Sequence, residues 1–278
     1  MSYKNKKSLA FITAITLLIT LSMTPFLGTS TASSAFFDFE SGTLTKWSGT
    51  TGTAPTIQFG NAYSGNYSLL ASTWVSYAYY YTGTSGIADS NLTFHVKTNT
   101  LPSLWQQNGF AQIKDVDDQN TLLIGVCYNE PTIGPEWWII TFDSNGNNNM
   151  YLSHVPVSGM DWQNVTLLRY TDANYYTLVI NNNVIINQTH DFAKNAGYFE
   201  LGCMYCDVIG WTGNNIDDVS ISSVSLDSQP TPTPMDSPVP TPSPTPTNTS
   251  MTSNNWADFG QWIANGSALQ TWKNLAGK

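Results

Sequence analysis

The sequence predicts an all-β fold in which two antiparallel sheets pack face to face as a sandwich. Between Phe36 and Leu226, short runs of β-branched and aromatic residues recur and are bounded by Asn, Asp and Gly turns. Helical periodicity is almost absent from this region. The chain has 278 residues, 41% of them hydrophobic. It can therefore bury one sizeable core, but not a second full domain once its ends are set aside.

The first half of this region contains strand signals separated by polar turns. Residues 91–96 alternate polar and apolar side chains, which is typical of a strand with one buried face. An acidic turn at residues 115–118 and a second turn at residues 143–146 separate later runs. The strands expected here cover residues 76–82, 91–96, 110–113, 121–127, 137–142 and 150–154.

The second half, residues 161–226, predicts a meander of strands around which the rest of the domain is organised. Residues 163–170 and 175–180 are strand-like runs joined by the turn Thr171-Asp172-Ala173-Asn174. After three asparagines comes a further run, and the strands at 198–202 and 216–221 close the region. About a dozen strands in all suit a two-sheet sandwich.

The two ends of the chain differ from the middle. Residues 1–35 read as a signal peptide, with Lys4, Lys6 and Lys7 before an apolar stretch and small residues at 32–35. The alternative is an uncleaved N-terminal anchor, because residues 9–27 nearly suffice to span the ~30 Å hydrocarbon core of a bilayer. Either reading takes the bulk of the chain out of the cytoplasm, so we expect a secreted or cell-surface protein.

Beyond the sandwich at residues 36–228, the composition changes completely. Residues 229–253 are a Pro/Thr/Ser-rich linker, which lacks apolar groups for a core and is expected to be extended. Residues 254–278 form a short Trp-containing tail with Trp256, Phe259, Trp262 and Ile263 at roughly helical spacing. This amphipathic tail is too short to be stable alone. We expect a docking or interfacial segment, with a neighbouring surface protein as its partner, or the stub of something longer.

The charge balance limits the partners. Only 10% of the residues are charged, and the net charge is −9. Phosphate backbones, anionic lipids and acidic glycans require basic patches. The composition therefore excludes nucleic acid as a main partner and leaves the membrane only to the N-terminal segment, if that segment stays uncleaved.

Several short motifs resemble the concanavalin A-like (laminin-G-like) jelly rolls. The opening Phe37-Asp38-Phe39-Glu40-Ser41-Gly42, the "GYFELG" strand at 197–202 and "NIDDVSI" at 215–221 are similar to strands of that group. The resemblance covers roughly residues 36–227. It implies a jelly-roll sandwich, and it predicts the fold better than it predicts the ligand.

Two enzyme classes of this fold carry motifs that are not matched. Laminarinase-like glucanases have E-x-D-x-x-E on one strand, which places carboxylates on one face, and no such run occurs here. Jelly-roll alginate lyases have Q-I-H and Y-F-K-A-G-x-Y. At the corresponding positions this chain has Lys114, Glu200 and Met204 in place of the His, Lys and Tyr. Glu200 would repel a polyuronate. We therefore expect no enzymatic activity.

Aromatic side chains are the positive indication of glycan binding. Sugar rings stack their C–H faces on Trp and Tyr, while amides and hydroxyls bind the sugar oxygens. Because side chains alternate along a strand, one of Trp137 and Trp138 should be buried and the other exposed. The packing alternative is that many of these aromatics simply fill the core. The candidate carbohydrate-binding residues are Trp74, Tyr77, Trp105, Tyr128, Asn129, Trp137 and Trp211.

A structural calcium site is the other candidate. In related modules the strand with F-E-S-G meets the strand with I-D-D-V, and their carboxylates bind Ca²⁺. The resemblance thus implies Glu40, Asp217 and Asp218 as ligands, and hard oxygen donors suit Ca²⁺. The alternative is that the two aspartates only solvate an edge strand.

The cysteines fit an extracellular protein. Cys203 and Cys206 form a C-x-x-C motif, and Cys127 is the third cysteine. Zinc would need four ligands, and the three histidines lack ligand spacing. One disulfide is expected with one thiol left over, and the sequence leaves the pairing open.

These observations predict a non-catalytic, lectin-like module that binds neutral glycans or an extracellular polysaccharide. The alternative is a structural or adhesion protein of the envelope that makes protein contacts. A glycoside hydrolase or polysaccharide lyase with unfamiliar catalytic residues is the third reading.

Overall fold

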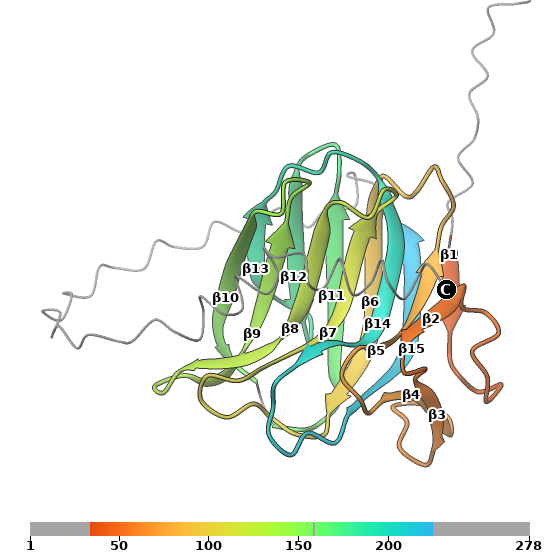
Figure 1. The fold of residues 1–278 in the computed structure, drawn as a ribbon, viewed down its shortest axis with the longest axis vertical. Helices are drawn as coiled ribbons and strands as arrows, with labels where there is room; N and C mark the ends of the chain where they lie inside the picture. The colour runs from red at the N-terminus through yellow and green to blue at the C-terminus, as the bar shows by residue number, and fades with distance from the viewer. Residues whose placement is uncertain (1–33, 158, 225–278) are drawn as a thin grey trace, which may run out of the picture. The chain divides into compact units, whose positions relative to one another are not determined.

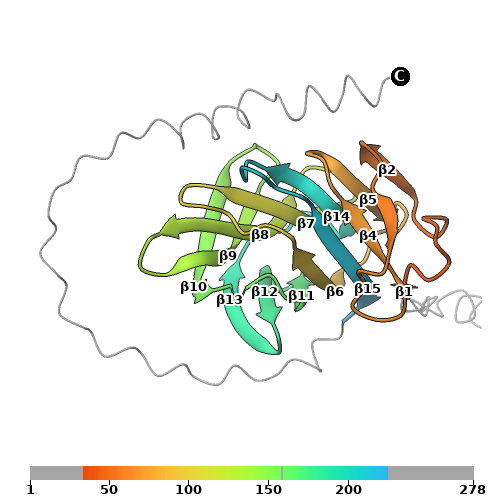
Figure 2. The same ribbon diagram turned by 90° about the horizontal axis from the view of Figure 1, so that it is seen from below.

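The computed structural model describes residues 34–157 and 159–224, and this part of the chain is all-β. Its fifteen strands belong to two antiparallel sheets, which form the two layers seen in Figures 1 and 2. The predicted fold class, an antiparallel two-sheet sandwich, is confirmed. The linker and the tail expected from the sequence lie outside the described residues, as does the expected signal peptide except for its last two residues, which belong to β1.

Sheet A has the order β13-β12-β11-β6-β15-β4-β3, and β1 pairs with the far part of β15. Its strands are β1 (Ser34–Phe37), β3 (Thr56–Phe59), β4 (Tyr67–Ala71), β6 (Asp89–Thr98), β11 (Gln163–Tyr170), β12 (Tyr175–Ile180), β13 (Asn183–Thr189) and β15 (Asn214–Ser223).

Sheet B has the order β10-β9-β8-β7-β14-β5-β2. Its strands are β2 (Gly49–Gly52), β5 (Ser76–Tyr81), β7 (Gln107–Asp115), β8 (Thr121–Glu130), β9 (Gly134–Phe142), β10 (Asn148–Pro156) and β14 (Ala196–Cys206).

The core lies between the inner faces of the two sheets. Phe94 of β6, Phe110 of β7, Trp137 of β9 and Phe199 of β14 are all 0–2% exposed. Phe110 and Trp137 meet edge to face, with ring centroids 5.9 Å apart. The alternation predicted at residues 91–96 places Leu92, Phe94 and Val96 inward.

The short strands β1, β2 and β3 were not predicted as separate elements, because each has only four residues. They pair at the edges of longer strands and are defined by those pairings. The described residues contain no helix long and apolar enough to cross a membrane.

Candidate functional site

Most of the predicted glycan-binding residues lie at one end of the sandwich. β14 ends there at Cys206, and its neighbours β5 and β7 begin there, since Cys203 pairs with Ser76 and Cys206 with Asn108. The loops after β4, β6, β8 and β14 therefore share this end, which we call the loop end. Figure 1 shows the loops after β6 and β14 near each other, and Thr100 joins them by a hydrogen bond to the carbonyl of Gly210 (3.4 Å). Four separate segments of the sequence thus form one surface.

Trp105 is held on this surface by backbone hydrogen bonds. Its N–H donates to the carbonyl of Tyr128 (2.7 Å), and the N–H of Tyr128 donates to the carbonyl of Gln106 (3.0 Å). The backbone of Trp105 has a φ of 68°, an uncommon value for a residue with a side chain. The indole is 46% exposed. A strained backbone that presents a large ring to solvent is typical of a functional position.

Asp207 connects the loop after β14 to the start of β7. Its carboxylate accepts the N–H of Gln107 (2.5 Å) and the hydroxyl of Tyr205 (3.2 Å), and its carbonyl accepts the side-chain amide of Gln106. Burial raises the pKa of Asp207 above its usual range. This carboxylate and its Tyr205 partner provide the polar groups that a sugar hydroxyl needs beside an aromatic ring. Neither residue was predicted from the sequence.

The same end carries further aromatic side chains. Trp74, in the turn before β5, is 52% exposed. Trp211 is half-buried, and its indole N–H has no hydrogen-bond partner among the described residues. Ile209, two residues before it, is 85% exposed. Asn129 is half-buried beside Tyr128 at the end of β8.

The structure separates Trp137 from the other candidates. Its side chain is 2% exposed and packs in the core between the sheets, so it is not available to a ligand. Trp138 points to the opposite face of sheet B, as strand alternation requires, but it is 0% exposed. Tyr77 lies on that outer face as well and is 4% exposed. The expectation that one of the two tryptophans would be solvent-exposed is therefore wrong.

The outer face of sheet B also carries a charged cluster. The ammonium of Lys114 lies 2.9 Å from Asp118 and 3.4 Å from Glu200, and Gln112 donates to Glu200. Burial raises the pKa of Glu200. Burial alone would lower the pKa of Lys114, but the two carboxylates raise it above its ordinary value. One ammonium group, that of Lys114, thus contacts both carboxylates.

Tyrosines border this cluster. Tyr81 and Tyr198 stack with centroids 4.7 Å apart, and Tyr79 lies 6.3 Å from Tyr198. All three are half-buried. Tyr81 and Tyr198 were not predicted as site residues. What identifies them is that Tyr198 pairs with Tyr81 across two strands. This pairing depends on strand register, which the sequences of the two strands do not reveal separately.

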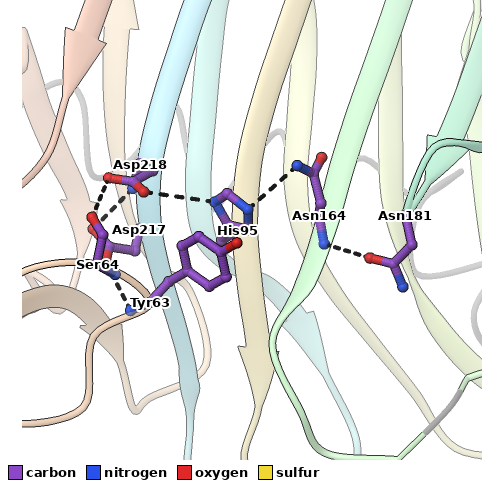
Figure 3. A network of polar contacts seen from close by, with 7 residues as sticks. All are labelled: Tyr63, Ser64, His95, Asn164, Asn181, Asp217 and Asp218. Atoms are coloured by element: carbon purple, nitrogen blue, oxygen red, sulfur yellow. Dashed lines mark hydrogen bonds and ion pairs between the residues drawn. The ribbon is translucent and has the colours of Figure 1, made fainter.

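Two of the residues expected to bind calcium, Asp217 and Asp218, lie on β15 of sheet A beside the loop that carries Tyr63 and Ser64 (Figure 3). Asp217 is fully buried and accepts the N–H groups of Tyr63 (2.9 Å) and Ser64 (3.1 Å). Asp218 accepts the Ser64 hydroxyl (2.8 Å). Burial raises the pKa of Asp217 to about 6. Both aspartates sit at a bulge of β15, where its neighbour changes from β4 to β1.

Glu40 holds the other side of the same loop. Its carboxylate accepts the N–H groups of Asn66 (2.8 Å) and Tyr67 (2.9 Å). The three predicted ligands therefore contact one loop. Glu40 and Asp217 accept its backbone N–H groups, and Asp218 accepts the Ser64 hydroxyl. Within residues 34–157 and 159–224, no group of three or more His, Cys, Asp or Glu side chains is arranged to hold a metal ion. In this arrangement the carboxylates serve as acceptors for groups of the loop.

The three cysteines are separated into a pair and a single residue. The thiols of Cys203 and Cys206 contact each other across a bulge in β14, and this contact raises the pKa of Cys203 and lowers that of Cys206. Cys127 is buried on the outer face of sheet B.

A groove of about 530 Å³ lies elsewhere, between the edge strands β10 and β13. Its lining includes Met150, His154 and Val184, and none of the predicted site residues. It is thus separate from the loop end.

The described chain belongs to the class of antiparallel β-sandwiches. No protein-family model and no curated protein matches the sequence. Among solved structures, the Crh5 transglycosylase in complex with NAG is similar at a TM-score of 0.48 and 13% identity, over 69% of this chain and 85% of that one. Domain 4 of AbnA, a GH43 extracellular arabinanase from Geobacillus stearothermophilus, in complex with arabinotriose, is similar at a TM-score of 0.46 and 16% identity. The match covers 69% of this chain and 93% of that one.

The botulinum neurotoxin serotype D binding domain is similar at a TM-score of 0.43 and 13% identity, over 70% of this chain. The match covers 44% of that domain, less than half of its length. Similarity at this level does not assign ligands or residue roles to the present chain.

Proposed function

We propose that this chain is a secreted, non-catalytic protein that binds neutral glycans through the loop end of the sandwich. The observation that carries the proposal is the convergence of Trp74, Trp105 and Trp211 from three loops, and of Tyr128 from the end of β8, all far apart in the sequence. Two of these indoles are about half exposed. Exposed rings beside a hydrogen-bonding carboxylate suit stacking on a sugar face combined with contacts to its hydroxyls.

The charges near this surface support a neutral ligand. Asp207 lies in the site, and Glu130 is exposed at the end of β8 beside Asn129. Both carboxylates would repel a uronate or sialic acid, and the chain has few cations in total. A neutral polysaccharide of an extracellular matrix or cell surface meets no such barrier.

The test is a glycan-array screen of the full chain and two single variants. Trp105→Ala removes an exposed ring from the loop end, and we expect binding to fall about tenfold, equivalent to roughly 1.4 kcal/mol. Phe59→Ala is the matched control, because Phe59 is an aromatic side chain that is 68% exposed on β3 of the other sheet. Its affinity should stay within about twofold of the parent chain.

Other outcomes separate the alternatives. Equal loss of binding in both variants would show that the loop end is not the site. A folded parent chain that binds no glycan would refute the proposal and favour the structural or adhesion role. Release of a shortened sugar product would establish the glycan-cleaving alternative, for which the Gln112, Lys114 and Glu200 cluster is the place to begin.

A calcium ion remains a separate proposal. Glu40 and Asp217 hold one loop between them, so a cation that replaced the amide donors would hold the same loop. Such an ion would stabilise the sandwich without taking part in glycan chemistry. It is tested by the pH experiment developed in the Discussion.

A further inference from the structure

Cys203 and Cys206 lie close together where β14 is distorted by a bulge. The register shifts between Leu201 and Tyr205, so that four steps along β14 match only two steps along β7. Residues three positions apart, which a regular strand would separate by ~10 Å, are thus drawn together. The thiol of Cys203 donates a hydrogen bond to the sulfur of Cys206.

The third cysteine lies too far away to pair with either of them. Asn108 of β7 pairs with Cys206 on one side and with Val126 of β8 on the other. Cys127 follows Val126 and is thus two strands away from β14, which is roughly 10 Å at ~4.8 Å per strand. A disulfide needs Cα atoms within ~7 Å of each other. Of the possible pairings, only that of Cys203 with Cys206 is therefore compatible with the sheet.

The two thiols of this pair differ in their access to solvent and in their acidity. Cys203 is 0% exposed, whereas Cys206 is half-buried at the end of β14. The hydrogen bond from Cys203 lowers the pKa of Cys206, and the backbone N–H of Val208 acts in the same direction, against the effect of burial. The thiolate, not the thiol, is the nucleophile in disulfide exchange. Cys206 is therefore the group that an external oxidant meets first.

Cys127 provides an internal comparison. It is 1% exposed, and burial together with the nearby Glu136 raises the pKa of its thiol. A buried thiol that stays protonated reacts poorly with oxidants and alkylating reagents. The chain thus combines a pair of thiols in contact with one isolated thiol of low reactivity.

We propose that Cys203 and Cys206 are a redox-active pair, in which Cys206 attacks an external disulfide and Cys203 completes an intramolecular disulfide bond. The oxidant is a low-molecular-weight disulfide, R–S–S–R, which reacts by thiol–disulfide exchange. This reaction involves no glycan and does not depend on the proposed function.

The oxidation takes place in two exchange steps. The Cys206 thiolate attacks one sulfur of the oxidant, which forms a Cys206–S–S–R bond, breaks the S–S bond of the oxidant and releases one RS⁻. The Cys203 thiol then loses its proton to water, and its sulfur attacks the neighbouring Sγ atom of Cys206. This forms the Cys203–Cys206 bond and releases the second RS⁻. The protein loses two electrons and two protons, and the oxidant takes them up as two RSH molecules.

The pair lies next to the loop end. Asp207 follows Cys206 directly and is joined to β7, because its carboxylate accepts the N–H of Gln107 (2.5 Å). The loop that begins there also carries Trp211. A bond between Cys203 and Cys206 would fasten the start of this loop to the interior of β14. Oxidation of the pair would thus restrain one of the segments that form the loop end.

The test measures the oxidation state of each cysteine in the full chain. The reduced chain is freed of reductant and incubated with oxidised glutathione. The remaining thiols are then blocked with N-ethylmaleimide in denaturant, and the peptides are mapped by mass spectrometry. We expect a disulfide between Cys203 and Cys206, while Cys127 takes up the label. The control Cys127→Ser should form the same bond.

Other products would overturn the proposal. These are free thiols at both positions of the pair after oxidation, a disulfide to Cys127, disulfides only between two chains, or glutathione that stays attached to the parent chain at Cys206. Alkylation of the reduced, folded parent chain needs no substitution in the pair. Iodoacetamide should modify Cys206 at least about tenfold faster than Cys127, and equal rates would contradict the assigned nucleophile.

Two variants test the order of the two steps. Cys203→Ser removes the second thiol, so Cys206 should remain in a mixed disulfide with glutathione. Cys206→Ser leaves only the buried thiol of the pair, so a glutathione adduct at Cys203 should form at least about tenfold more slowly. Equal rates of adduct formation in the two variants, both shown to be folded by circular dichroism, would refute the order. No glycan is present in these experiments, so they remain interpretable if the proposed function fails.

Discussion

Asp217 offers a direct test of how the bulge of β15 is stabilised. Its side chain is 0% exposed and accepts backbone N–H groups from Tyr63 and Ser64. The change Asp217→Asn keeps the size of the side chain and one carbonyl oxygen but removes the titration. The comparison between the parent chain and this variant therefore isolates the effect of one proton.

The size and sign follow from the raised pKa. Burial raises the pKa of Asp217 from 3.8 to about 6. At about 1.4 kcal/mol per pH unit, this corresponds to roughly 3 kcal/mol. The folded state binds the proton more tightly than the unfolded chain. Asp217 therefore contributes its full stability below about pH 4 and loses it as the pH rises through about 6.

The assay is urea unfolding of the full chain and of Asp217→Asn at a series of pH values. We expect the stability difference, parent minus variant, to fall by roughly 3 kcal/mol between about pH 4 and about pH 7. A difference that stays constant, or rises with pH, would refute the argument. Added Ca²⁺ provides the test of the calcium proposal. A bound cation favours the ionised carboxylate and would reverse the trend.

Three further changes test other parts of the structure. Gly125→Ala would place a methyl group 2.1 Å from the carbonyl oxygen of Asn108. We therefore expect urea unfolding to show a destabilisation of at least about 2 kcal/mol, and a loss of stability below about 0.5 kcal/mol would contradict the strand spacing. Glu40→Ala removes the acceptor of the Asn66 N–H, so hydrogen exchange at that amide should accelerate about tenfold. Unchanged protection of the amide would show that other contacts hold the loop. Trp138→Ala should cost about 3–5 kcal/mol because the ring is fully buried on the outer face of sheet B, while a cost near 1 kcal/mol would contradict that burial.

The sequence by itself determined the fold class and much of the strand pattern. The alternation at residues 91–96 correctly gives the inward positions Leu92, Phe94 and Val96 of β6. The Asn turn after residue 180 correctly separates β12 from β13. These features are local, because side-chain alternation and turn chemistry act over a few residues. The opposite orientation of Trp137 and Trp138 is predictable for the same reason.

Only the tertiary structure decided which residues come together and which face of sheet B packs against sheet A. Asp207 joins the loop end because it accepts the N–H of Gln107, a hundred residues earlier in the chain. Alternation assigns Trp137 and Trp138 to two faces, but it does not tell which face is the core or whether the other is covered. The physical reason is that burial and site geometry depend on strand order and register. Contacts between distant segments set both of these.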